Sequence, residues 1–84
     1  MLSTEELKSF IETTERLKYL TKEERERYAR WTLKKAMLKV DYEIEMLKGN
    51  KSVMEKLERS FNRFNHLQLL LLEVGEKRGI KYEE

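Results

Sequence analysis

The chain has 84 residues, contains no Cys and no Pro, and carries 18 Lys or Arg against 16 Asp or Glu, a net charge of +2. This length allows one small domain, residues 1–84, and the lack of Cys excludes disulfides, cysteine-based zinc sites and thiol nucleophiles. Charged residues make up 40% of the chain, which is typical of a soluble helical protein with ion-paired faces and resembles thermophile usage. The longest apolar run, 69–72, is far too short to span a membrane. The polar N-terminus predicts no signal peptide, so we expect a cytoplasmic protein.

Three helix starts share one local signal, a Ser or Thr followed three residues later by Glu, at 3–6 (STEE), 21–24 (TKEE) and 52–55 (SVME). In such a capping box the hydroxyl accepts a hydrogen bond from the backbone amide three residues on. The Glu side chain in turn accepts one from the amide of the capping residue. Gly49 and Gly79 each follow a basic residue and predict left-handed caps at helix C-termini.

These signals predict helices at about 4–20, 22–48 and 53–78, followed by a short tail at 80–84. The predicted fold class is therefore all-α: an antiparallel three-helix bundle with two long helices and a shorter first helix. No Gly or Pro separates the first two helices near Thr21, so the sequence leaves open whether they are separate or continuous.

The apolar residues of the first helix form one stripe, whereas those of the second form two. The stripe of the first helix contains Leu7, Phe10, Ile11, Thr14 and Leu17. An aliphatic face of the second helix contains Ala29, Leu33, Ala36, Met37, Val40, Ile44 and Leu47. The nearly opposite, aromatic face contains Tyr28, Trp31, Leu38, Tyr42 and Met46. Two apolar faces require two neighbours: either the first and third helices cover one face each, or the aromatic face meets a second protein chain.

The third helix has a heptad-like seam suited to antiparallel packing. This seam contains Leu57, Phe61, Phe64, Gln68, Leu71 and Gly75. Gln68 must be hydrogen bonded if it is buried, and we expect it to specify register or partner. Gly75 costs about 1 kcal/mol of helix propensity relative to Ala, so we expect it to allow a close backbone approach or to lie near the helix end. Leu69 and Leu70 point away from the seam, so one small core cannot bury all four leucines of 69–72.

The surplus apolar side chains predict a protein partner, either a second copy in a homodimer or a larger protein assembly. The residues expected at this interface are Tyr28, Trp31, Leu38, Tyr42, Leu69, Leu70 and Val74. The predicted function is that of a non-enzymatic helical interaction module, an accessory or scaffold subunit. We expect no cofactor, no metal site and no small-molecule substrate.

Nucleic-acid binding is the alternative function, because basic residues gather on one side of the second and third helices. Residues 22–40 carry seven Lys or Arg against three Glu. The residues expected to contact phosphates are Arg27, Arg30, Lys34, Lys56, Arg59, Arg63 and His66. Trp31 could stack on a base, as in single-strand binding proteins. The simpler interpretation is a solvated charged face.

The segment RSFNRFNH places Arg59 seven residues before His66, the only histidine, on one helical face. It resembles the Arg-(4–6 residues)-His motif of HEPN ribonucleases, which are helical and dimeric. The resemblance implies a pair acting across a dimer interface on an RNA 2′-hydroxyl, with His as acid or base and Arg stabilising phosphate charge. It covers eight residues, and the polar residue that usually follows the Arg is Ser60 here. The simpler interpretation is a solvated His on a basic helix.

Overall fold

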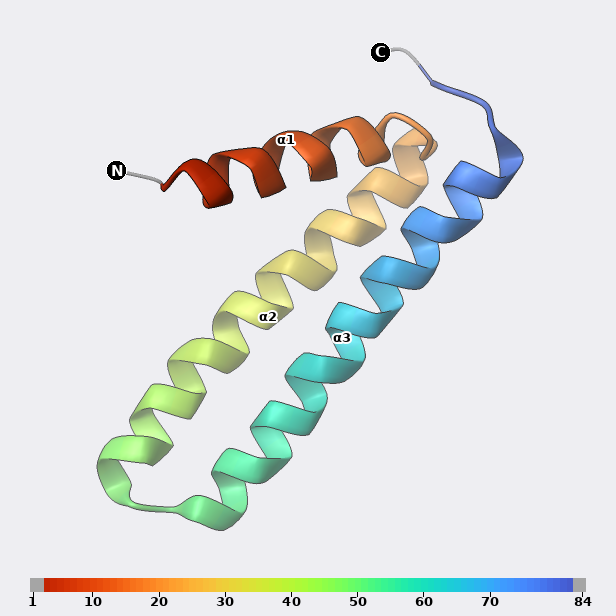
Figure 1. The fold of residues 1–84 in the computed structure, drawn as a ribbon. Coiled ribbons are helices and arrows are strands. Elements are labelled where there is room, and N and C mark those ends of the chain that lie inside the picture. The colour runs from red at the N-terminus through yellow and green to blue at the C-terminus, as the bar shows by residue number, and fades with distance from the viewer. Residues whose placement is uncertain (1–2, 83–84) are drawn as a thin grey trace.

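The computed structural model describes residues 3–82, which form three α-helices. They are α1 (Thr4–Leu17), α2 (Lys22–Lys48) and α3 (Lys51–Arg78). Figure 1 shows α2 and α3 side by side and antiparallel as a long hairpin, with the shorter α1 turning back from the start of α2. The predicted all-α architecture with two long helices is confirmed, and the first two helices are separate.

Two of the three predicted N-terminal caps are confirmed. The Oγ of Ser3 accepts a hydrogen bond from the amide three residues on, at 3.1 Å. Thr21 and Glu24 form the complete reciprocal box, with donor–acceptor distances of 3.2 and 2.9 Å. The third box is wrong, because α3 begins directly after Asn50 and Ser52 lies inside its first turn.

The predicted C-terminal caps are confirmed at Gly49 and Gly79, whose φ angles of 72° and 69° are left-handed and cost glycine little. The first helix ends earlier than the predicted residue 20. The amides of Lys18, Tyr19 and Leu20 donate to carbonyl oxygens three residues back instead of four. These hydrogen bonds to the third residue back make the last turn of α1 tighter than an α-helical turn, and the chain then enters α2.

Leu20 anchors the turn between α1 and α2 against the end of α3. Its side chain is 0% exposed, and Leu72 at 3% is the other buried apolar side chain among residues 3–82. A Cβ at the buried Gly75 would lie 2.7 Å from Leu20 Cδ2 and 2.8 Å from the backbone oxygen of Tyr19. The absence of a side chain at Gly75 therefore allows the close backbone approach expected from the sequence.

The described part of the C-terminal tail is hydrogen bonded to the turn between α1 and α2. The amide of Tyr82 donates to the carbonyl oxygen of Lys18 at 2.8 Å, and Arg25 Nη2 donates to the carbonyl oxygen of Tyr82 at 2.7 Å. Arg78 forms an ion pair with Glu24 at the start of α2. One end of the hairpin is thus closed by α1, the turn and the tail, while the last two residues of the predicted tail lie outside the described part.

The hairpin interface follows the predicted seam of α3, whose six residues are all buried or half-buried. Gln68 is 3% exposed, and its side chain is fully hydrogen bonded. Its Nε2 donates to the carbonyl oxygen of Tyr28 at 3.1 Å and to Thr32 Oγ1 at 2.7 Å. Its Oε1 accepts from Lys35 Nζ at 2.8 Å. A buried amide must be satisfied, so these partners on one side of α2 specify the register of the two helices.

Lys35 lies between the long helices as part of this network. Its Nζ also donates to Asn65 Oδ1 at 2.9 Å and lies 5.2 Å from the centre of the Phe61 ring. Burial, and to a lesser degree the charge of Lys39, lower the pKa of the Lys35 ammonium. A charged group is accepted at this interface because oxygen acceptors and an aromatic face replace its hydration.

Beyond its last turn, α1 makes few contacts with the hairpin. Arg16 pairs with Glu76 of α3, whereas Leu7, Phe10 and Ile11 are exposed. Figure 1 shows α1 and α2 diverging from the turn that joins them. The molecule is consequently elongated, with axes of 47, 27 and 18 Å. Within residues 3–82, none of the helices combines the length and apolarity needed to cross a bilayer.

Candidate interaction surface

The aliphatic face of α2 points away from α3 and is exposed along its length. We name this face the outer stripe, and it consists of Ala29, Leu33, Ala36, Met37, Val40, Ile44 and Leu47. Leu33 is 63% exposed and Leu47 is 86% exposed. The side of α2 that binds Gln68 lies nearly opposite, and α1 diverges from α2. Neither neighbouring helix therefore covers the outer stripe.

The extent of the outer stripe is unusual for a monomer. From Ala29 to Leu47 it runs about 27 Å along the helix, or about five turns. Monomeric soluble proteins rarely expose contiguous apolar patches above a few hundred Å², and larger ones mark interaction sites. The sequence identified these residues as one face of the helix but did not assign a partner to them.

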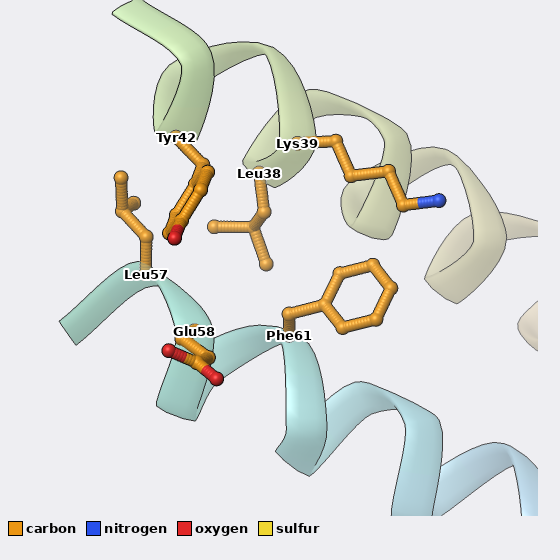
Figure 2. A pocket seen from close by; sticks show the side chains of 6 residues that line it. All are labelled: Leu38, Lys39, Tyr42, Leu57, Glu58 and Phe61. Atoms are coloured by element: carbon orange, nitrogen blue, oxygen red, sulfur yellow. The ribbon is translucent and has the colours of Figure 1, made fainter. Parts of the chain in front are cut away.

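The aromatic face of α2, expected to meet a partner, instead lies on the α3 side of the helix. Tyr28, Trp31, Leu38 and Tyr42 are half-buried, and Figure 2 shows Leu38 and Tyr42 directed toward α3. Burial raises the pKa of the Tyr28 hydroxyl. Because α3 already occupies this face, the surface of α2 left for a partner is the outer stripe. A further contact of the aromatic residues with a partner stays a prediction.

Near the Gly49 end of the hairpin, the inner residues leave an apolar cleft. The cleft has a volume of about 210 Å³. It is lined by Leu38, Lys39, Tyr42, Leu57, Glu58 and Phe61 (Figure 2). Lys39 Nζ lies 5.4 Å from the centre of the Phe61 ring. Three of the six lining side chains, Leu38, Leu57 and Phe61, are apolar, so the cleft lies where the apolar side chains of the two long helices leave space between them.

The leucines of α3 expected at the interface are exposed but do not form one patch. Leu69 is 44% exposed and Leu70 43%, and Val74 is also exposed. At about 100° per residue, Leu70 and Val74 lie one turn apart on one side, and Leu69 lies further round the helix. The predicted separation of Leu69 and Leu70 from the seam is confirmed, and Leu71 and Leu72 are turned inward as expected.

The basic residues lie on the surface in two shallow depressions. The depression along α2 is lined by Arg27, Arg30, Trp31 and Lys34. The depression along α3 is lined by Arg59, Asn62, Arg63, His66 and Leu67. Lys34 Nζ lies 5.9 Å from the centre of the Phe64 ring, so this side of α2 reaches α3. Lys56 is exposed but lines neither depression.

Arg59 and His66, the pair of the HEPN resemblance, share the depression along α3. Within residues 3–82, no group of His, Asp or Glu side chains has a geometry suited to holding a metal ion. No protein-family model matches the chain, and no curated protein and no solved structure shows significant similarity to it. The function must therefore be inferred from the surface itself.

Proposed function

We propose that the protein is a helical interaction module that binds another protein chain through the outer stripe of α2. The observation that carries the proposal is the exposure of Leu33, Met37 and Leu47 on a helix whose other side is already packed. A partner helix laid along the stripe would remove these side chains from water, at about 25 cal/mol per Å² of apolar surface.

The placement of α1 supports the same function. Its side chains Leu7, Phe10 and Ile11 form a second exposed apolar surface, and α1 is held to the hairpin mainly through its last turn and the buried Leu20. A partner can therefore contact α1 without disturbing the network around Gln68. A packed hairpin with a separate exposed apolar surface suits an accessory or scaffold subunit.

The double substitution Leu33→Lys and Val40→Lys tests the proposal by placing two charges on the outer stripe. The matched control, Ser9→Lys and Ser52→Lys, adds the same charge at exposed positions outside the stripe. The mass of each protein is measured by size-exclusion chromatography with light scattering, alone and in an extract of the source organism.

We expect the wild type and the control to run in a complex, with themselves or with another protein, and the stripe variant to run as a single chain. A wild type that runs as a single chain under both conditions would contradict the proposal. A complex that the stripe variant retains would show that another surface is responsible.

Nucleic-acid binding is the second candidate, favoured by the grouping of Arg59, Arg63 and His66 in one depression along α3. It predicts that affinity for a single-stranded RNA falls steeply with added salt. Arg63→Glu should weaken binding, and the distant Lys51→Glu should weaken it much less. An RNA affinity that does not change with salt concentration would exclude this candidate. If the RNA is cut, undiminished cleavage by His66→Ala would exclude the role suggested by the HEPN resemblance.

A further inference from the structure

We infer that the occupant of the outer stripe is a second copy of this chain, packed antiparallel along α2 with the two-fold axis near residue 35. This inference rests on the proposed function and names its partner. It is carried by the surface that one chain leaves exposed, by the order of charges beside the stripe and by the sizes of the side chains along it.

One chain exposes far more surface than a compact folded domain of the same mass. Its accessible surface is 6980 Å² for a mass of 10.3 kDa, whereas a folded monomer of that mass exposes about 5,400 Å². The radius of gyration is 15.3 Å, against about 12 Å for a compact domain of this length. The excess of about 1,600 Å² exceeds the roughly 800 Å² that each partner contributes to a standard interface. A second copy can therefore bury a full interface on surface that a compact monomer would not expose.

Four exposed charges flank the outer stripe on one side, in the order Glu23, Arg30, Asp41 and Lys48. At about 100° per residue they share one edge of the stripe. Glu23 and Lys48 lie at equal distances from the midpoint between residues 35 and 36, and so do Arg30 and Asp41. Lys34, on the same side, is directed over the Phe64 ring of α3 instead.

This order of charges distinguishes the two possible orientations. When two copies of α2 pack antiparallel about that midpoint, each Arg30 faces Asp41 of the second copy and each Glu23 faces its Lys48. The two-fold axis repeats both pairs, so four opposite-charge contacts form. In a parallel pairing the two-fold axis would run along the helices and set this edge against the opposite edge of the second copy, so none of these four opposite-charge contacts would form.

The sizes of the side chains along the stripe favour a closely similar antiparallel alignment. With the two-fold axis one residue away, between residues 34 and 35, Leu33 falls opposite Ala36 of the second copy and Val40 falls opposite its Ala29. A large residue then meets a small one in each of these layers, which allows the helices to approach closely and interdigitate. A second copy of α2 thus complements the stripe in both shape and charge.

Cysteine cross-linking tests the orientation, because the chain contains no Cys of its own. Ala29→Cys and Ile44→Cys are made as separate proteins, both at exposed positions near opposite ends of the stripe. We expect the mixture to form a mixed disulfide under mild oxidation, while each protein alone forms little. Disulfides of each protein with itself, and none between the two, would show a parallel pairing and overturn the inference.

Charge reversal tests the register. Arg30→Asp and Asp41→Arg each bring like charges together twice, and each should raise the dimer dissociation constant by about tenfold. The double variant restores opposite charges, so its dissociation constant should return close to that of the wild type. Double-variant affinity no better than that of the single variants would overturn the proposed register.

The outcomes separate this inference from the proposed function. A chain that stays monomeric up to millimolar concentration, yet joins another protein in a complex lost on Leu33→Lys and Val40→Lys, would overturn the second copy as partner and retain the interaction module. A dimer insensitive to those stripe substitutions would overturn both. An antiparallel dimer that they dissociate supports both.

Discussion

The inner and outer sides of α2 are built from different kinds of side chain. The inner side, toward α3, presents groups with directional partners: Thr32 and Lys35 hydrogen bond to Gln68, and Lys35 and Lys39 lie over the Phe61 ring. The outer side presents Leu33, Val40 and other aliphatic residues that have no polar atoms in their side chains.

This difference shows how one helix can serve two interfaces. Directional contacts fail when a helix slides by one turn, so the inner side permits a single register. Aliphatic contacts tolerate such sliding because hydrophobic burial is non-directional. Any register on the outer side must therefore come from the charges at its edge, such as Arg30 and Asp41.

The largest expected difference in unfolding free energy is that between Leu72→Ala and Leu33→Ala. Leu72 is 3% exposed and Leu33 63%. Deleting the inner side chain leaves a cavity and should cost about 2–5 kcal/mol of unfolding free energy, whereas the outer deletion should stay within about 0.5 kcal/mol. Urea unfolding in dilute solution, where self-association is negligible, measures both. Equal losses would mean that the two sides are not distinct.

Gly75→Ala tests whether the closed end of the hairpin depends on close backbone approach. The change gains about 1 kcal/mol of helix propensity, but the new Cβ would overlap Leu20 and the backbone of Tyr19. Overpacking should prevail, with a net loss of about 1–3 kcal/mol in the same urea experiment. Adding Leu20→Ala leaves the contact with the backbone oxygen and also removes a fully buried side chain, so the double variant should be less stable than Gly75→Ala alone. A stabilised Gly75→Ala protein would refute the close approach.

Gln68→Leu tests the polar network on the inner side. The substitution keeps the volume of the side chain but leaves Thr32 and Lys35 without their shared partner. We expect a loss of about 1–3 kcal/mol, because three hydrogen bonds are lost and one of them involves the charged Lys35. Asn65→Leu, which removes a single exposed acceptor of Lys35, serves as the control and should cost less. A stability gain in Gln68→Leu would show that the amide is not needed for the fold.

The smallest effect is expected from Glu24→Gln at the closed end. The hydrogen bond from Arg78 is the main cause that lowers the pKa of Glu24 below its ordinary 4.5, against the opposing effect of burial. A lowered pKa in the folded state means that the carboxylate contributes stability above about pH 4.5, which is lost as the pH falls through the folded pKa. The wild type should therefore lose more stability than Glu24→Gln between about pH 5 and pH 3, by less than about 1 kcal/mol. Glu26→Gln, outside this ion pair, is the control, and identical profiles for all three proteins would exclude the role of Glu24.

Local signals in the sequence were sufficient to predict the three helices and much of the packing of the hairpin. Thr21 with Glu24, and Gly49 and Gly79, act through atoms within one helical turn, so their sequence context determines their conformation. The spacing of the α3 seam also placed Gln68 correctly between the helices. The predicted cap at Ser52 was wrong because α3 starts two residues earlier. Its capping residue is Asn50, whose side chain makes no capping hydrogen bond.

The assignment of the two faces of α2 needed tertiary information. Both faces have apolar residues at helical spacing, and periodicity alone does not say which one α3 will cover. The aliphatic face looks more like a core, but only the inner side offers Thr32 and Lys35 to the buried Gln68. The available signal was the pairing of a polar seam residue with polar residues on α2. The order of charges beside the outer stripe was also present in the sequence.

The turn at Gly49 has a consequence for the order of folding. Residues on either side of it are close in sequence, so the contacts of α2 and α3 can form from there with little loop-closure entropy. The buried position of Leu20 lies beside Gly75, at the opposite end of the hairpin from Gly49. It forms only when α2 and α3 are aligned along their full length. Docking of α1 and its turn is therefore expected to come last, after the main barrier, where it slows unfolding and leaves the folding rate largely unchanged.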